Sequence, residues 1–244
     1  MLKKDLINHI QKYYLNGSCK SVRWEISDGN TIVDFLTDDK GMLGSVQSKN
    51  LSLNDGVFAT NATDRLLSIL GALSDEISCK YDISRKEIVG MNFADEVVTV
   101  YFAGGDLKAT FDPGNILANY RDRGRKLKSD PENVCNFQLS DEFIKRFVKS
   151  KKAISEAKIV AFDKDKFIIN YSELNTNRIL IPVDVIGNNT EFYVYNIDHL
   201  FNILSVNDDM KSGSIEISNM GLLTIEFEND YSESLYYLNP INMK

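Results

Sequence analysis

The chain has 244 residues, of which 43% are hydrophobic and 26% charged, and it carries a formal net charge of −7 at pH 7. That composition is ordinary for a folded protein and excludes a wholly disordered chain, while no apolar run approaches the roughly 20 residues that a membrane-spanning helix needs. The three cysteines, Cys19, Cys79 and Cys135, are odd in number and far apart. With no signal-peptide pattern, they indicate reduced thiols and a cytoplasmic protein.

The first half is predicted to run helix, strands, helix, strands. It opens with an amphipathic basic helix over residues 3–14, in which Leu6 and Ile10 mark the apolar face. A central helix follows over residues 63–73, with Asp64 in the first turn, where the helix dipole favours an acid. Alternating apolar residues and turn signals predict the strands of this half at residues 21–26, 31–36, 56–60, 88–93, 97–102 and 107–111.

A connector and a second half follow. Residues 114–136 are rich in glycine, proline and charge and show no helix or strand pattern, so we expect an exposed connector. Helices are predicted after it over residues 140–152 and 197–204. The strands of this half are predicted at residues 157–162, 167–171, 178–183, 191–195, 214–218, 222–227 and 235–238.

The two halves repeat each other in sequence. Residues 58–70 (FATNATDRLLSIL) lie over residues 192–204 (FYVYNIDHLFNIL) without a gap, and VVTVYF at 97–102 matches LLTIEF at 222–227. A duplicated unit of this length predicts an α+β protein of two tandem domains, each with antiparallel sheets and two helices. The expected boundaries are 1–113 for the first domain, 114–136 for the connector and 137–244 for the second domain.

The positive charge of this acidic chain gathers on the helices that open the two halves. Residues 140–152 hold five cations against two carboxylates, and residues 3–14 hold three cations against one. On a single helix such a run is more often only a solvated face. Because the pattern recurs at the same place in both halves, we interpret it as a functional separation of charge by surface.

No set of residues predicts catalysis. His9 and His199 each fall on a predicted helix with no cysteine or carboxylate at metal-ligand spacing, and both are interpreted as surface residues. The sequence contains no phosphate-binding loop, dinucleotide-binding glycine pattern or nucleophile elbow. We therefore expect a protein that is not an enzyme and needs neither a cofactor nor a metal.

Three motifs resemble the DNA polymerase sliding clamps, with the nearest likeness to those of T-even-type bacteriophages. They are GVFATNATDRLLSILGAL with its second copy EFYVYNIDHLFNIL, QLSDEFIKRFVKSKKAISEAKIVAF, and SIEISNMGLLTIEFENDYSESLYYLNPI. The resemblance implies a DNA-clamp fold in which three two-domain subunits close into a ring, with helices around the hole and sheets outside. It also implies a processivity factor that encircles duplex DNA and tethers the replicative DNA polymerase. A separate ATP-dependent clamp loader would open the ring, in the infected host cell if the source is viral.

The resemblance also implies which residues act. Residues 106–111 would pair as an edge strand with residues 178–183 of a neighbouring subunit and so close a homotrimer. Partners would insert a tail peptide into a pocket walled by Ile116, Leu117, Tyr120, Tyr237, Pro240 and Ile241, although the connector residues could instead pin the loop, with Tyr237 in the core. The DNA-facing residues would be Lys4, Lys12, Arg65, Lys145, Arg146, Lys149, Lys152 and His199.

An alternative from another class stays open, and the sequence departs from the clamp pattern in two places. A non-enzymatic phage accessory or structural protein built from a duplicated β-rich domain would explain the repeat, but not the paired basic helices in an acidic chain. The first half opens almost directly with its helix, which shortens the leading strand. The connector is unusually basic between Arg121 and Lys128. Native mass separates the two functions, because only the clamp requires a ring.

Overall fold

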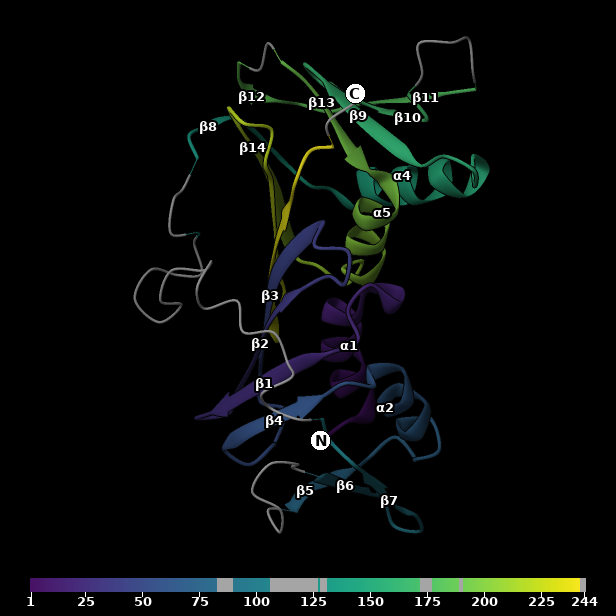
Figure 1. The fold of residues 1–244 in the computed structure, drawn as a ribbon, viewed down its shortest axis with the longest axis vertical. Helices are drawn as coiled ribbons and strands as arrows, with labels where there is room; N and C mark the ends of the chain where they lie inside the picture. Colours follow the sequence, from purple (N-terminus) through teal and green to yellow (C-terminus); the bar gives the residue numbers. More distant parts are fainter. Residues whose placement is uncertain (83–89, 106–126, 128–130, 172–176, 189–190, 242–244) are drawn as a thin grey trace. The chain divides into compact units, whose positions relative to one another are not determined.

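The computed structural model describes residues 1–82, 90–105, 127, 131–171, 177–188 and 191–241 (Figure 1). The chain falls into two compact units. Unit 1 comprises Met1–Lys40, Gly44–Leu127 and Tyr231–Ser234, and unit 2 comprises Gly41–Leu43, Lys128–Asp230 and Leu235–Lys244. Each unit therefore includes a short segment from the other half of the sequence. None of the described helices is long and apolar enough to cross a membrane.

Unit 1 combines helices with two sheets. Its elements, in chain order, are α1 (Lys3–Tyr14), the 3-10 turn η1 (Leu15–Gly17), β1 (Val22–Ser27), β2 (Asn30–Leu36), β3 (Met42–Lys49), β4 (Gly56–Thr60), α2 (Thr63–Leu70), β5 (Ser78–Asp82), β6 (Gly90–Ala94) and β7 (Thr99–Phe102). The strands follow the order β3-β2-β1-β4 in one sheet and β5-β6-β7 in the other. β1 and β2 meet at a tight turn in which Asp28 and Gly29 both have positive φ, the backbone geometry that a two-residue hairpin turn requires.

Unit 2 has the same plan with a longer leading strand. Its elements are β8 (Asn133–Gln138), α4 (Asp141–Ala153), β9 (Ile159–Asp163), β10 (Lys166–Ile169), β11 (Ile179–Pro182), β12 (Ile186–Gly187), β13 (Phe192–Asn196), α5 (Ile197–Val206), β14 (Ser212–Ser218), β15 (Leu223–Glu228) and β16 (Ser232–Leu238). One sheet has the order β11-β10-β9-β13, and the strands β12-β8-β14-β15-β16 are neighbours in another.

The strand pairing confirms the predicted duplication. β1 lies between β2 and β4 and is antiparallel to both, as β9 lies between β10 and β13. The order β3-β2-β1-β4 thus corresponds strand for strand to β11-β10-β9-β13, and β5-β6-β7 to β14-β15-β16. The protein has the α+β architecture of two tandem copies that the sequence predicts.

The leading strand differs between the copies. In unit 2, six residues of β8 precede α4 and pair with β14. In unit 1, the residues before α1 make one isolated bridge, Leu2 with Glu76, and Ile77 N donates to Met1 O at 3.0 Å. The segment before the first helix therefore pairs at the corresponding place in both units, but in unit 1 this pairing is reduced to a single bridge.

Aromatic clusters fix the helices on the sheets. In unit 1, Trp24 on β1 is fully buried and makes edge-on ring contacts with His9 and Tyr13 of α1, with centroids 5.4 and 6.1 Å apart. In unit 2, Phe167 on β10 contacts Phe143 and Phe147 of α4 at 5.7 and 6.3 Å. Burial of one such ring contributes about 1.5–3 kcal/mol, so these contacts hold the first helix of each unit to its sheet.

Several strands were not anticipated. β3, β5 and β12 lack a strong apolar alternation, and β8 takes residues 133–136, which we expected in the connector. In β3, a Cβ on Gly44 would lie 2.3 Å from Cζ of Phe35, so this strand needs a glycine, a residue that usually argues against a strand. Among the described residues, β7 is the third strand of its sheet and so corresponds to β16. Residues 97–102 contain β7, whereas residues 222–227 contain most of β15. The sequence match between these two segments therefore aligned strands that are not equivalent. The strand predicted at 107–111 lies outside the described residues.

Candidate nucleic-acid interface

Helix α4 forms because its two sides have opposite character. The hydroxyl of Ser140 caps the N-terminus by accepting a hydrogen bond from Phe143 N at 3.1 Å. Acidic residues occupy the first turn and lysines the last, which suits the helix dipole. Phe143, Ile144 and Phe147 form a buried stripe against the core. The remaining side of the helix is left to solvent.

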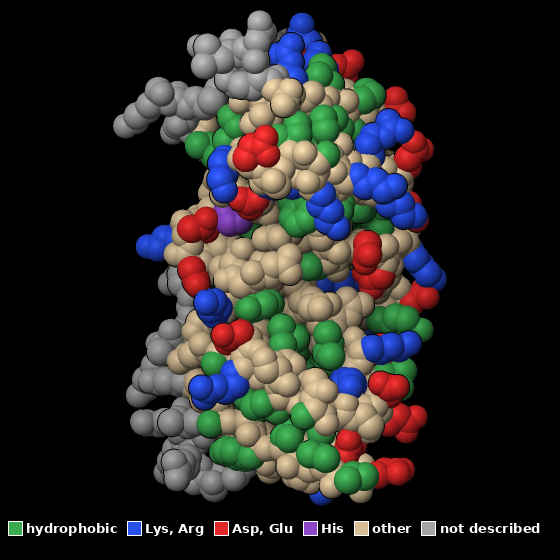
Figure 2. All heavy atoms as spheres, turned by 90° about the vertical axis from the view of Figure 1, so that its right-hand side faces the viewer, with side chains coloured by type: hydrophobic (Ala, Val, Ile, Leu, Met, Phe, Trp, Pro, Cys, Tyr) green, Lys and Arg blue, Asp and Glu red, His purple; other side chains and the backbone are tan. Residues whose placement is uncertain are grey.

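Lysines occupy that solvent side. Lys145, Lys149 and Lys152 follow the i, i+4, i+7 spacing that places side chains on one helix face, and all three are exposed together with Arg146. Figure 2 shows Lys and Arg side chains standing on the surface with Asp and Glu side chains between them. The structure therefore brings these four predicted DNA-facing residues together on one surface of α4.

The four cations differ in their partners. Lys145 Nζ lies 3.8 Å from Asp141, and Arg146 lies 2.5 Å from Glu142, both as exposed i, i+4 pairs. No carboxylate of the described residues pairs with Lys149 or Lys152. The first turn of α4 is thus locally neutral, and the surplus positive charge lies toward its C-terminus.

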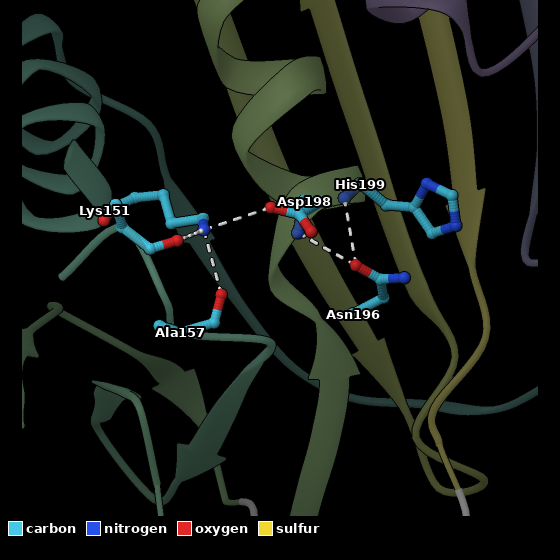
Figure 3. Close-up of polar contacts among 6 residues, drawn as sticks. Lys151, Ala157, Asn196, Asp198 and His199 are labelled. Carbon is cyan, nitrogen blue, oxygen red and sulfur yellow. Dashed lines mark hydrogen bonds and ion pairs between the residues drawn. The ribbon is translucent and has the colours of Figure 1, made fainter.

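A fifth cation of α4, Lys151, points inward (Figure 3). Its side chain is 9% exposed, and its ammonium donates to Ser155 O at 2.8 Å and Ala157 O at 2.9 Å. The same ammonium lies 3.1 Å from Asp198, whose side chain is 50% exposed at the start of α5. Lys151 therefore ties α4, the segment before β9 and α5 together. In the sequence, Lys151 is distinguished only as one member of a basic run.

The start of α5 is organised around Asn196. Its side-chain oxygen accepts hydrogen bonds from Asp198 N at 2.9 Å and His199 N at 3.4 Å, which caps the helix (Figure 3). His199 is buried, so its predicted place on the DNA-facing surface is wrong. A single apolar stripe could not reveal this, because α5 is nearly apolar and buries several sides.

Unit 1 offers fewer exposed cations. Lys4 on α1 and Arg65 on α2 are exposed as predicted, each beside an exposed acid, Asp5 and Asp64. Lys3 is half-buried and donates to Leu73 O. The helix surface of unit 1 is therefore close to balanced in charge, unlike that of α4.

Lys12 does not reach the surface, and its prediction as DNA-facing is wrong. The residue is 2% exposed, and its ammonium donates to Ser232 Oγ at 2.7 Å. Residues 231–234 belong to unit 1 and cover this end of α1. His9, one turn earlier, is buried with Nδ1 2.8 Å from Ser48 Oγ, so its interpretation as a surface residue is also wrong.

Unit 1 joins its two helices through a tyrosine hydroxyl. Tyr13 occupies the place on α1 that Lys151 occupies on α4, the eleventh residue of each helix. Its hydroxyl accepts from Trp24 Nε1 at 3.2 Å and also bonds to the side chain of Thr63 at the start of α2. Burial raises the pKa of Tyr13. The contact between α1 and α2 is therefore neutral and buried, whereas the contact between α4 and α5 is an ion pair that is partly exposed to solvent.

Sequence reasoning missed two exposed lysines at equivalent positions. Lys20 O accepts from Thr63 N at 3.3 Å, and Lys158 O accepts from Ile197 N at 3.2 Å, where Thr63 and Ile197 are the first residues of α2 and α5. Both lysine side chains are exposed. Their only sequence signal is their place just before the first strand of each half.

The predicted partner-peptide pocket is represented by its tail half alone. Tyr237 is buried, Pro240 is half-buried and Ile241 is exposed. The tail is held by Asn239 N, which donates to Gly41 O at 3.4 Å, and by Ile241 N, which donates to Val194 O at 2.7 Å. Ile116, Leu117 and Tyr120 lie outside the described residues.

The described residues offer little for covalent or metal chemistry. They contain no group of three or more His, Cys, Asp or Glu side chains placed to hold a metal ion. Burial raises the pKa of the Cys19 and Cys79 thiols to about 12, which leaves almost no thiolate at neutral pH.

Comparison with known proteins identifies the fold. The structure is similar to the Proliferating Cellular Nuclear Antigen of Entamoeba histolytica, with a TM-score of 0.67 and 12% identity over 99% of this chain and 96% of that one. It is also similar to a chain of the PCNA2-PCNA3 complex of Sulfolobus tokodaii, with a TM-score of 0.71 and 8% identity over 98% and 97%. No family model and no curated protein matches the sequence. The chain thus has the PCNA-type clamp fold.

Proposed function

We propose that this protein is a subunit of a sliding clamp that encircles duplex DNA and tethers a DNA polymerase. One observation carries the proposal: an acidic chain with the clamp fold exposes a stripe of lysines on α4, opposite the phenylalanines that anchor the helix. Such a stripe suits the phosphate backbone, which attracts cations without regard to base sequence. The net charge of −7 discourages DNA from binding elsewhere on the molecule.

Sheet edges support assembly into a ring. In unit 1, the edge strand β3 is extended by the segment 231–234, since Lys49 N donates to Tyr231 O at 2.8 Å. In unit 2, the equivalent strand β11 pairs with β10 and with no other described strand. An open edge of this kind invites a strand from another chain.

We propose that this strand is β7 of a second copy, in place of residues 106–111, which lie outside the described residues. Residues 232–234 begin β16, and β7 holds the equivalent place in unit 1. Leu180 on β11 is 49% exposed and Tyr101 on β7 is 54% exposed, so pairing of the two edges would cover both. Because the contact is head-to-tail, it repeats until the rotation closes, which the sequence resemblance predicts to occur at a homotrimer.

The interface has a direct test with a matched control. Leu180→Glu should convert the assembly to monomers that keep the wild-type thermal stability, because the side chain is exposed in one chain. Ile186→Glu, at a more exposed position on β12, should leave the native mass unchanged. Native mass by light scattering would contradict this pairing if the Leu180 variant stayed assembled, and a monomeric wild-type protein would contradict the ring itself.

The sliding function predicts a topological hold on DNA. Assembled protein that has threaded onto linear duplex should survive a high-salt wash only when both DNA ends are blocked by bound protein. Loss at high salt from blocked and open DNA alike would leave ordinary electrostatic binding as the explanation. The proposed partners are double-stranded DNA, a replicative DNA polymerase and an ATP-dependent loader, with the T-even phage clamps as the predicted nearest type.

The polymerase is proposed to dock beside the tail. Leu117, Pro240 and Ile241 would form part of an apolar pocket for a short peptide, together with Ile116, Tyr120 and Tyr237. Leu117→Ala combined with Pro240→Ala should abolish stimulation of the polymerase while native mass and thermal stability stay unchanged. Stimulation that survives this pair of changes would place the partner elsewhere.

A further inference from the structure

Asp198 lies on a helix next to the proposed DNA-binding surface, where a negative charge would weaken the attraction of DNA. Its carboxylate is half exposed on the first turn of α5, and its partner Lys151 directly precedes Lys152 of the exposed stripe. A bare carboxylate there, on a helix in contact with α4, would repel the DNA phosphates that the lysines of α4 attract. The structure instead gives this acid a cation of its own.

The cation that faces Asp198 is not available to DNA. The Lys151 side chain is 9% exposed and its ammonium also donates to two backbone carbonyls, Ser155 O and Ala157 O. These bonds hold the ammonium between the Asp198 carboxylate and the backbone carbonyl of Ala157 (Figure 3). Lys151 therefore cannot swing out to become another phosphate contact, and its charge acts on Asp198.

The fold itself does not require this ion pair. Unit 1 ties α1 to α2 through Tyr13 and Thr63, both neutral and buried, and the equivalent acid Asp64 stands exposed without a described cation partner. Two copies of one architecture thus solve the same helix contact differently. The ionic solution occurs in the unit whose first helix carries the surplus lysines.

We propose that Lys151 is a charge mask: it neutralises Asp198 so that the helix surface of unit 2 presents only the positive charge of Lys149 and Lys152 to DNA. Lys151 is a positioning residue that touches no phosphate. This inference rests on the proposed function, since it assigns Lys151 a role in DNA attraction beyond its structural one.

The test separates charge from structure. Lys151→Gln removes the charge while the amide can still donate to Ala157 O, and it should weaken DNA binding on the order of threefold at low salt. The double variant Lys151→Gln/Asp198→Asn restores a neutral site and should return affinity to the wild-type value. Lys151→Arg, which keeps the charge, should bind DNA like the wild type.

The salt dependence of binding supplies a second readout. Lys149→Gln/Asp198→Asn should show a shallower slope of log affinity against log salt, because each lost phosphate contact lowers the slope by about 0.9. Lys151→Gln/Asp198→Asn should keep the wild-type slope. Thermal unfolding of each variant reports any loss of structure separately.

Two results would overturn the charge mask while leaving the clamp proposal intact. One is a Lys151→Gln/Asp198→Asn variant that binds as weakly as Lys151→Gln, which would make the role of Lys151 purely structural. The other is a shallower slope for that double variant, which would make Lys151 a phosphate contact. If Lys149→Gln/Asp198→Asn keeps the wild-type slope as well, the DNA-binding surface itself is misplaced and the proposed function fails.

Discussion

The two units share an architecture but differ in how they join their helices and in what those helices present. Unit 1 uses a buried hydroxyl network, from Tyr13 to Trp24 and Thr63, whereas unit 2 uses the ion pair of Lys151 and Asp198. Unit 1 places Lys4 and Arg65 beside acids, whereas α4 leaves Lys149 and Lys152 with no described acid partner. The two copies thus share one scaffold, while the charge on their solvent-facing helices differs.

The largest expected effect tests whether DNA attraction is concentrated in unit 2. Lys149→Ala/Lys152→Ala should weaken DNA binding about tenfold to a hundredfold, because each assembled copy loses two cations without internal partners. Lys4→Ala/Arg65→Ala removes the same charge from unit 1, where acids already offset it, and should cost about threefold at most. Fluorescence anisotropy with a labelled duplex measures both. Equal losses would show that the two units share the task.

A smaller effect concerns the two helix ties. Tyr13→Phe should destabilise the protein by about 1–3 kcal/mol, because Trp24 Nε1 loses its acceptor in a dry core, and the loss should not depend on salt. The partly exposed pair in unit 2 is screened by salt, so the loss in Lys151→Met should be smaller at high salt than at low salt. Thermal unfolding at two salt concentrations compares them. A loss of stability in Tyr13→Phe that depended on salt would contradict this difference between the units.

The smallest effect concerns two hairpin turns, in which the charged side chain belongs to unit 1 and the neutral side chain to unit 2. In unit 1, Asp95 accepts hydrogen bonds from Ser74 N at 2.8 Å, Val98 N at 2.6 Å and Val97 N at 2.8 Å, which hold its pKa well below the usual range. In unit 2, the neutral hydroxyl of Ser218 accepts from Met220 N at 3.3 Å and Leu222 N at 3.0 Å. An ionised acceptor and a neutral one should respond differently to acid.

Lowering the pH should therefore reduce the stability contribution of the turn at Asp95 but not that of the turn at Ser218. Because the folded pKa of Asp95 is depressed, its contribution to stability is present above the unfolded pKa of about 3.9 and is lost as the pH falls below it. Asp95→Asn should lower the Tm at neutral pH and make little difference in acid, whereas Ser218→Ala should give the same shift at both. Calorimetry across that range would refute the assignment if the Asp95 effect were independent of pH.

Sequence predicted the features that depend on local pattern. The duplication, the helices, most strands and the exposure of Lys145, Lys149 and Lys152 follow from periodicity and from one repeat compared with the other. The errors concern residues whose environment is set by distant segments. Lys12 is covered by Ser232, which lies 220 positions away, and Lys151 is turned inward by the carbonyl of Ala157 and by Asp198. A helical period identifies the apolar side but not which polar residues another segment will cover.

The segment 231–234 has a consequence for how the chain can fold during its synthesis. Unit 1 starts at Met1, yet its buried Lys12 finds Ser232 Oγ only after nearly the whole chain has left the ribosome. A nascent first half lacks this acceptor for the Lys12 ammonium, and a buried cation is costly unless its hydrogen bonds are made. Completion of unit 1 is therefore tied to β16, which residues 232–234 begin. A chain truncated before residue 231 would lose this contact of unit 1 as well as part of unit 2.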